Sequence, residues 1–479
     1  VEQNYEKAVE WYTKVAEQGV SNAQDSLGDC YYYGNGVEQN YEKAVEWYTK
    51  AAEQGHSYSQ SSLGVCYYVG NGVNQDYKKA VEWYTKAAEQ GNHFAQCSLG
   101  NCYYLGNGVR KDYQTAIEWY TKAAEQGNSG AQFSLGNCYY FGHGVSQDYE
   151  TAVEWYTKAA EQEHSGSQDI LGDCYYYGNG VNQDYETAVE WYTKAAEQDN
   201  EYSQVSLGDC YYYGNGVNQD YETAVEWYTK AAEQGIADAQ NKLANCFLQG
   251  YGVEENIQKA YQWFMEAANQ DNYDAQHSLG LFYQYGFGVV EPDLKKALEL
   301  YTKAAEQGNS DAQTSLGDCY YRGTGVDKDY VKAVEWYTKA VEQGNSNAQV
   351  ALGICYQIGF GVQVDYKKTI ELYTASAEQN NCKGIYYLAD SYRTGTNGVL
   401  INKAKAKELF RKGMELGDTR CETAYNKMIQ NEDIFNTVKG IGLNFLRNSN
   451  GIIGQLGNAV YETLYEENNQ SNDYSDDEY

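Results

Sequence analysis

A tryptophan recurs every 36 residues and divides the chain into units. The nine Trp fall at 11, 47, 83, 119, 155, 191, 227, 263 and 336, and the first eight keep this spacing without exception. Residues 171–198 and 207–234 are identical at all 28 positions. About twelve units are visible, so the fold must be one that repetition of a short unit can build.

Each unit carries the pattern of two short helices. In one, Tyr149, Ala152, Tyr156 and Ala159 share a face at helical spacing, and Asp148 can cap the first free N–H groups. Helices of this kind end at a glycine in most units, as at Gly19, Gly55, Gly91 and Gly127.

The second helix of the unit is predicted around residues 131–140 and stops at Gly142. Gly136 stands in mid-helix, where glycine costs about 1 kcal/mol relative to alanine. We therefore predict that a neighbouring helix approaches closely at Gly136. The unit is a helix–turn–helix with a Gly-Asn-Gly-Val connection.

These residues resemble a known family. The string Ala-Val-Glu-Trp-Tyr-Thr-Lys-Ala-Ala-Glu-Gln-Gly, with Ala-Gln-x-Ser-Leu-Gly-x-Cys-Tyr and Gly-x-Gly-Val, is similar to the Sel1-like repeat, a relative of the tetratricopeptide repeat. The resemblance covers residues 1 to about 430. It implies an all-α fold, a right-handed α-solenoid superhelix of about twelve repeats, and a role as an adaptor. Stacking is also required physically, because a two-helix unit cannot bury its apolar face alone.

Three parts are expected: the repeat solenoid over 1–430, an amphipathic helical segment over 431–465 and an acidic, disordered tail over 466–479. The last repeats diverge, as expected of a cap with a solvated outer face. The middle segment either packs back on these repeats as a lid, which we favour, or binds a partner or a membrane surface. Its apolar stripe is Ile434, Val438, Ile441 and Phe445.

The two ends of the sequence suggest further features. Val1 corresponds to Val37 in the loop of a unit, so we expect the chain to be part of a longer one. Ser475 in the tail precedes Asp476, Asp477 and Glu478 and is a possible phosphorylation site for an acidophilic kinase.

Charge and hydropathy exclude several classes of function. With 35 Lys and Arg against 67 Asp and Glu, the net charge is −32. A chain of this charge is repelled by nucleic-acid phosphates and by anionic lipid. No run approaches 18 apolar residues, so no transmembrane segment is expected. The acidic surface favours protein partners with basic segments.

The cysteines are expected to be reduced packing residues. Nine of the twelve occupy one equivalent position, at 30, 66, 102, 138, 174, 210, 246, 319 and 355. Stacked equivalent helices lie about 8–10 Å apart, which is too far for a disulfide. Reduced thiols favour the cytoplasm, with the nucleus possible and the ER lumen disfavoured.

No catalytic, cofactor-binding or metal-binding residue is predicted. The five histidines lack a metal-ligand spacing, and neither a His-Glu-x-x-His nor a nucleophile-elbow motif occurs. The recurring carboxylates at Glu154 and Glu161 form a solvated face. The chain is therefore predicted to be non-enzymatic.

Binding specificity is sought at positions that differ between near-identical units. Such a position forms a stripe along a solenoid, and at least one stripe is hypothesised to contact a protein partner. The alternative is unconstrained drift on a solvent face. The candidate residues are Tyr58, Phe94, Phe133, Phe141 and Tyr202.

The sequence therefore predicts a scaffold or adaptor that binds proteins along the solenoid, in signalling or complex assembly. One alternative is the regulatory or docking arm of an enzyme, such as a protein kinase, whose catalytic domain precedes this chain. A second alternative is an ER-lumenal substrate receptor linked to degradation. Oligomeric state is left open.

Overall fold

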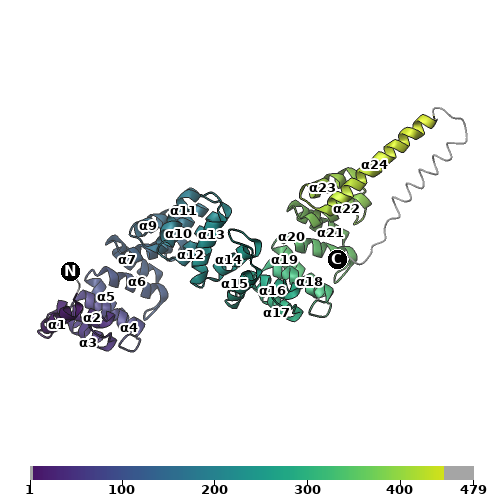
Figure 1. The fold of residues 1–479 in the computed structure, drawn as a ribbon. Coiled ribbons are helices and arrows are strands. Elements are labelled where there is room, and N and C mark those ends of the chain that lie inside the picture. The colour runs from purple at the N-terminus through teal and green to yellow at the C-terminus, as the bar shows by residue number, and fades with distance from the viewer. Residues whose placement is uncertain (1–3, 447–479) are drawn as a thin grey trace. The chain divides into compact units, whose positions relative to one another are not determined.

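The computed structural model describes residues 4–446, and every regular element in that range is an α-helix (Figure 1). The helices are α1 (Tyr5–Ala16), α2 (Ser21–Tyr33), α3 (Tyr41–Glu53), α4 (Ser57–Val69), α5 (Tyr77–Glu89), α6 (His93–Leu105), α7 (Tyr113–Glu125), α8 (Ser129–Phe141), α9 (Tyr149–Ala160), α10 (Ser165–Tyr177), α11 (Tyr185–Ala196), α12 (Glu201–Tyr213), α13 (Tyr221–Glu233), α14 (Ala237–Gln249), α15 (Ile257–Asn269), α16 (Tyr273–Tyr285), α17 (Leu294–Glu306), α18 (Ser310–Arg322), α19 (Tyr330–Glu342), α20 (Ser346–Ile358), α21 (Tyr366–Glu378), α22 (Cys382–Thr394), α23 (Lys403–Glu415) and α24 (Thr419–Leu446). Two helices per repeat confirm the predicted all-α solenoid of about twelve repeats.

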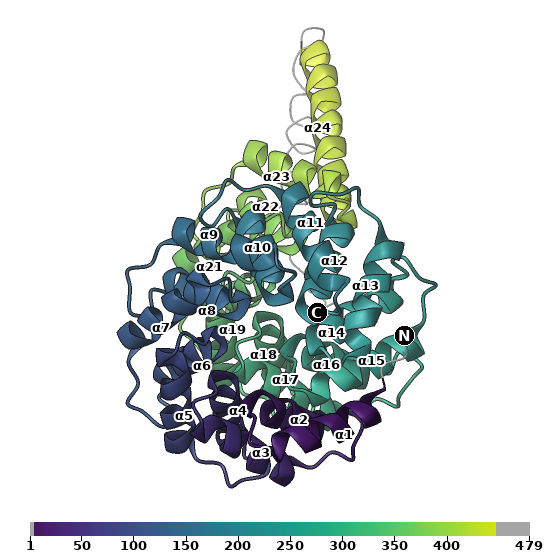
Figure 2. The same ribbon diagram turned by 90° about the vertical axis from the view of Figure 1, so that its left-hand side faces the viewer.

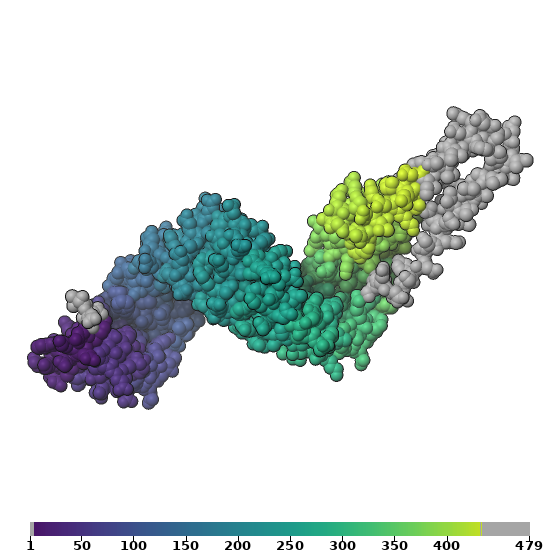
Figure 3. Space-filling model, in the orientation of Figure 1, coloured from purple at the N-terminus to yellow at the C-terminus, as the bar shows by residue number. Residues whose placement is uncertain are grey.

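The chain forms two compact units. Unit 1 is residues 1–270, with α1 to α15, and unit 2 begins at residue 271 and holds α16 to α24. Within unit 1 the even-numbered helices lie on the inside of the curve and the odd-numbered helices lie outside (Figure 2). They are termed the inner and outer helices below. The space-filling view shows the repeats of unit 1, purple to teal, packed directly against one another (Figure 3).

Side-chain caps and glycines set the helix ends as predicted. Asp148 accepts a hydrogen bond from the N–H of Thr151 at 3.1 Å and starts α9. After α6, Gly106 adopts a φ of 84°, the left-handed conformation that favours glycine. Gly108 is required for space, because a Cβ there would collide with the carbonyl oxygen of Tyr77.

Where a repeat has a mid-helix glycine in its even-numbered helix, that glycine lies against a tyrosine ring, which confirms the predicted close approach. A Cβ on Gly136 would lie 2.6 Å from the ring of Tyr156 in α9. Tyr156 is fully buried, and its hydroxyl donates to Oδ1 of Asn137 at 2.7 Å. The same packing joins Gly28 to Tyr48, Gly64 to Tyr84, Gly100 to Tyr120, Gly172 to Tyr192 and Gly208 to Tyr228 in unit 1, and Gly280 to Tyr301, Gly317 to Tyr337 and Gly353 to Tyr373 in unit 2.

Two repeats carry a different pair at these positions. Ala244 stands where the others have glycine, and the buried ring in the next outer helix is Phe264. In unit 2, Ala389 and Phe410 occupy the equivalent positions within one apolar cluster. The larger residue in the helix therefore accompanies a ring that has no hydroxyl to anchor.

A series of buried glutamines joins each repeat of unit 1 to the next. Gln132 in α8 donates from Nε2 to the Ala124 carbonyl at 3.1 Å, and its Oε1 accepts from Nε2 of Gln162 at 2.7 Å. Ala124 belongs to α7 and Gln162 follows α9, so one side chain connects two outer helices. The arrangement recurs at Gln24, Gln60, Gln96, Gln168, Gln204 and Gln240.

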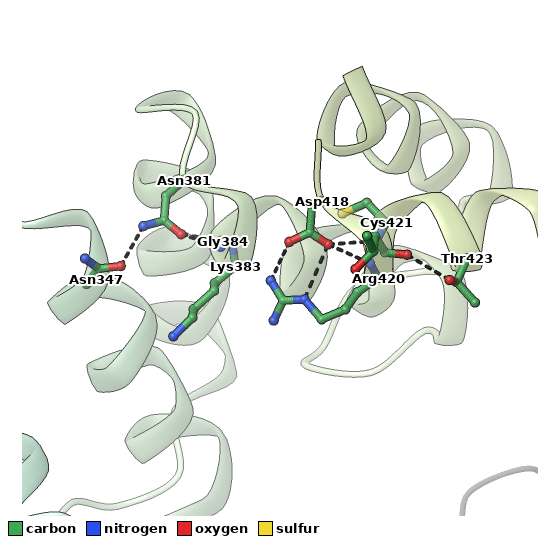
Figure 4. A network of polar contacts seen from close by, with 9 residues as sticks. Asn347, Asn381, Lys383, Gly384, Asp418, Arg420, Cys421 and Thr423 are labelled. Atoms are coloured by element: carbon green, nitrogen blue, oxygen red, sulfur yellow. Dashed lines mark hydrogen bonds and ion pairs between the residues drawn. The ribbon is translucent and has the colours of Figure 1, made fainter. Parts of the chain in front are cut away.

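The described part of unit 2 ends in a long helix. Oδ1 of Asp418 accepts from the N–H groups of Arg420 and Cys421, each at 2.9 Å, and the other carboxylate oxygen pairs with the Arg420 guanidinium (Figure 4). These contacts start α24, which continues without a break to Leu446. Residue 430, the expected end of the repeats, thus lies inside a helix.

Candidate protein-binding face

One side of each inner helix is open. In α6 it presents Phe94, Ser98, Asn101 and Leu105, spaced 4, 3 and 4 residues apart and hence on one side of the helix. None of the four is buried, whereas the adjacent Leu99 is 1% exposed. Stacked helices lie about 8–10 Å apart, so each position forms a row along unit 1. The four rows on α2, α4, α6, α8, α10 and α12 are termed the inner face.

The last row is apolar and exposed in six consecutive repeats. Its members and their exposed fractions are Tyr33 (66%), Val69 (55%), Leu105 (56%), Phe141 (57%), Tyr177 (65%) and Tyr213 (62%). Scattered apolar residues are ordinary on a protein surface, whereas one in register on every repeat forms a continuous strip. This strip, termed the apolar row, can pack against apolar side chains of a partner.

A polar row runs beside the apolar row. Five of its six residues each accept a hydrogen bond from the hydroxyl of a buried tyrosine in the next outer helix, at 2.6–2.7 Å, and the sixth is Val65 in α4. Because the core holds these five side chains in place, a partner would not have to order them. They are Asp29, Asn101, Asn137, Asp173 and Asp209.

The inner helices of the first six repeats carry no cation. The segments of α2, α4, α6, α8, α10 and α12 contain no Lys or Arg. The lysines of unit 1 stand instead largely on the outer helices, where Lys158 lies over the Trp155 ring at 3.9 Å. Five other repeats place an equivalent pair at 3.8–4.0 Å, and a sixth places Lys14 at 4.9 Å from the Trp11 ring. The inner helices of these repeats therefore offer no lysine or arginine to balance the carboxylates that some of them carry.

The carboxylates of the inner helices lie at two ends. Asp25 and Asp29 are in α2, and the others are in α10 and α12, whereas α4, α6 and α8 contain no Asp or Glu. Lys242 of α14 pairs with Asp209 at 3.0 Å. Over residues 4–446, no comparable lysine or arginine pair is found for Asp29, Asp169 or Asp173.

The titration of these carboxylates reflects their burial. Burial raises the pKa of Asp169 to about 6 against an ordinary value of 3.8, although Ser203 Oγ donates to it at 2.5 Å and partly offsets the effect. The charges of Asp173 and Glu201 raise that pKa further. Burial also raises the pKa of Asp29 and of Asp173. The inner helices α2 and α10 thus hold negative charge that burial destabilises.

The substitution Asp169→Asn should stabilise the chain in a pH-dependent way. A carboxyl whose pKa is higher in the folded state binds its proton more tightly there, so ionisation costs stability as the pH rises from about 4 to 6, and the cost persists above. The variant should therefore melt about 2–4 °C above the parent at pH 8, with a smaller difference at pH 4. Thermal melts across this range test the prediction. Asp148→Asn, at an exposed cap whose pKa is lowered, is the control and should show no such gain.

The structure places four of the five candidate residues on the inner face and the fifth between helices. Tyr58, Phe94 and Tyr202 lie in the first row of the inner face and are 53%, 53% and 62% exposed, and Phe141 belongs to the apolar row. Phe133 differs from these because it is half-buried and packs on the ring of His164 at a centroid distance of 5.0 Å. Phe133 is thus part of the packing between adjacent inner helices.

Other predicted residues lie outside the described part of the chain. The side chains of Ile434, Val438, Ile441 and Phe445 are not described, although α24 includes their backbone. Ser475 and the tail from residue 466 also lie outside it. Sequence reasoning missed the polar row. The 4, 3, 4 spacing of Phe94, Ser98, Asn101 and Leu105 was the signal that could have revealed it.

The thiols of residues 4–446 belong to the packing of the repeats. All twelve cysteines are free, the nine equivalent ones are buried, and burial raises the pKa of Cys102 to about 11. Within residues 4–446, no three His, Cys, Asp or Glu side chains are placed to hold a metal ion. None of the described helices is both long and apolar enough to cross a bilayer. A hollow of about 1110 Å³ in unit 2 lies beside Pro292, where a repeat has one extra residue.

A curved stack of helix pairs with an ordered, exposed inner face defines the class of helical-repeat solenoids. The chain belongs to the Sel1 repeat family. The family model matches residues 1–20, 21–56, 57–92, 93–128, 129–164, 166–200, 202–236, 237–272, 274–309, 310–345, 346–381 and 383–418. Each complete match begins at an even-numbered helix, so the family unit starts one helix later than the unit drawn from the sequence. Proteins of this family are generally non-catalytic interaction modules.

A solved structure agrees with this assignment. The chain is similar to c5321 of uropathogenic Escherichia coli, a protective antigen with an SLR fold, at 36% identity and a TM-score of 0.74, over 88% of this chain and 90% of that one. A Sel1 repeat protein of Oxalobacter formigenes is 34% identical, with a TM-score of 0.47, over 51% of this chain and 96% of that one. A search of curated proteins finds no match.

Proposed function

We propose that this chain is a non-enzymatic scaffold that holds a protein partner against the inner face of unit 1. The apolar row carries the proposal, because six consecutive repeats expose an apolar side chain in register. A folded chain gains nothing from exposing such a strip unless something packs on it. In this role the chain would assemble a signalling or other multiprotein complex. The free, buried thiols support a reducing compartment such as the cytoplasm.

The proposal is tested by removing the apolar row while keeping the fold. The triple variant Leu105→Ser, Phe141→Ser and Tyr177→Ser changes only side chains that are more than half exposed, so its melting temperature should stay close to the parent. Proximity labelling in the source cell with the full chain should lose its reproducible partners in this variant. A loss of roughly tenfold in labelling is expected if even one or two of the three side chains act as anchors.

The matched control places the same number of serines on the outer helices. Glu118, Glu154 and Glu190 are exposed on α7, α9 and α11, and their replacement by serine should leave the labelled partners unchanged. If both triple variants retain the partners, the inner face of unit 1 is not the binding surface. If only the outer variant loses them, the binding surface lies on the outer helices.

A further inference from the structure

The inner face of unit 1 has an ordered distribution of charge. The α2 end carries Asp29 in the polar row and Asp25 one helical turn before it, and the α10 end carries Asp173 in the polar row and Asp169 one turn before it. Asp25 and Asp169 stand at the position that Phe133 occupies in α8, between adjacent inner helices and at the edge of the inner face. Between them, α4, α6 and α8 contribute apolar and small polar side chains and contain no Lys, Arg, Asp or Glu. The order along the face is therefore acidic, apolar, acidic.

Both acidic ends are built into the fold in the same way. Ser59 Oγ of α4 donates to Oδ1 of Asp25 at 2.5 Å, and Ser203 Oγ of α12 donates to Oδ1 of Asp169 at the same distance. In each case the serine belongs to the next inner helix, so the carboxylate is held between two repeats. Asp25 has an additional neighbour in His56, whose Nδ1 lies 3.6 Å away.

The acidic ends adjoin the apolar row. Asp173 and Tyr177 are one helical turn apart in α10, and the carboxylates of Asp173 and Asp209 raise the pKa of the Tyr177 hydroxyl beyond the effect of its burial. Asp29 and Tyr33 repeat this relation in α2. A ligand that packs on the apolar row therefore reaches the carboxylates at both ends.

We infer that the inner face of unit 1 binds an extended polypeptide segment with Lys or Arg residues at both ends of an apolar stretch. The inference rests on the proposed function and adds the chemistry of the partner. Cationic ends supply the counter-charge that the six inner helices lack, and the apolar stretch covers Val69, Leu105 and Phe141. Complementary charge would also steer the segment into place.

The fold sets the spacing between the two basic ends of the bound segment. From α2 to α10 there are four steps between inner helices, or about 40 Å at about 10 Å per step. An extended chain rises about 3.3 Å per residue, so about twelve residues separate the basic ends. A segment with its basic residues in the middle would bring them against α6, which has no carboxylate.

Two labelled peptides of identical composition test the order of charge. The end-basic peptide has Lys-Arg-Lys at each end of twelve alternating Leu and Ser residues, and its isomer has the six basic residues at the centre. Fluorescence anisotropy with the full chain at about 50 mM salt should show the end-basic peptide binding at least tenfold more tightly. The difference should shrink at about 300 mM salt, because exposed charges are screened.

Variants at each end make the test specific to these carboxylates. The pair Asp25→Asn with Asp29→Asn, and the pair Asp169→Asn with Asp173→Asn, should each lower affinity for the end-basic peptide about fivefold. Asparagine keeps an acceptor for Ser59, Tyr48, Ser203 and Tyr192, so the fold should persist. The control pair Glu154→Gln with Glu190→Gln removes two exposed carboxylates from outer helices and should not change binding.

The outcomes separate this inference from the proposed function. Equal affinity for the two peptides, or equal effects of inner and outer carboxylate variants, overturns the charge order. If binding is then still lost in the triple variant of Leu105, Phe141 and Tyr177, the inner face keeps its proposed role. If that variant also binds as the parent does, both the inference and the proposed function fail. Failure of the end-basic peptide to bind at all overturns the inference.

Discussion

Gly172→Ala should destabilise unit 1 by about 2–4 kcal/mol, although alanine normally favours a helix. A Cβ at this position would lie 2.5 Å from the ring of Tyr192, which is 2% exposed and cannot move outward freely. Overpacking costs about 1–3 kcal/mol. Displacing the ring also breaks the bond from its hydroxyl to Asp173 at 2.6 Å, a charged hydrogen bond worth about 1.5–3 kcal/mol. The helix-propensity gain of about 1 kcal/mol offsets only part of this. Urea unfolding of the full chain measures the loss.

Two repeats of this chain show which second substitution should restore the stability lost in Gly172→Ala. The repeats with Ala244 and Ala389 carry Phe264 and Phe410 in place of tyrosine, and both rings are fully buried. A ring without a hydroxyl is not tied to the polar row and can shift to admit the methyl group. Gly172→Ala combined with Tyr192→Phe should therefore be more stable than the sum of the two single changes predicts, by about 1 kcal/mol or more. Strict additivity would show that the hydroxyl does not hold the ring in place.

Gln132→Leu should cost about 2–4 kcal/mol while removing no apolar contact. The side chain is 5% exposed, and leucine has a similar volume but cannot bond the Ala124 carbonyl or the Gln162 amide. Each buried polar group left without a partner costs about 1–3 kcal/mol. Chemical denaturation of the full chain gives the value.

Gln162→Ala is the matched control for Gln132→Leu. Gln162 is exposed, so water replaces the lost bond, and the cost should stay below about 1 kcal/mol. If the two substitutions cost the same, the buried glutamines do not connect the repeats energetically, and packing of the apolar residues alone joins them.

Much of the fold could be predicted because the same helix caps, glycines and apolar positions recur in successive units. The cap at Asp148, the glycine after most helices and the close approach at Gly136 follow from the local chemistry of one helix, and the structure confirms all three. The burial of the nine equivalent cysteines was also predictable from their shared register. These features depend on the helical spacing of residues and on the 36-residue repeat, and both can be read from the sequence.

The candidate face was only partly predictable, because it depends on how helices stack. Phe133 and Phe141 are both variable aromatic positions of α8, yet only Phe141 is exposed, while Phe133 packs against the next inner helix. Which of the two side chains is covered depends on the direction in which the neighbouring helix packs, and the sequence of one helix does not determine that direction. The hydrogen bonds from Ser59 to Asp25 and from Ser203 to Asp169 were likewise not predicted, because each joins residues 34 positions apart in adjacent repeats.

The near-identity of neighbouring repeats gives the inner face an adjustable length. Every junction in unit 1 uses the same glutamine contacts, so an in-frame gain or loss of one 36-residue copy between α2 and α10 would rejoin matching surfaces. Such an event would leave both acidic ends intact and move them apart or together by about 10 Å, or three residues of an extended ligand. The solenoid would act as a molecular ruler, and its copy number rather than any point substitution would set the spacing it measures.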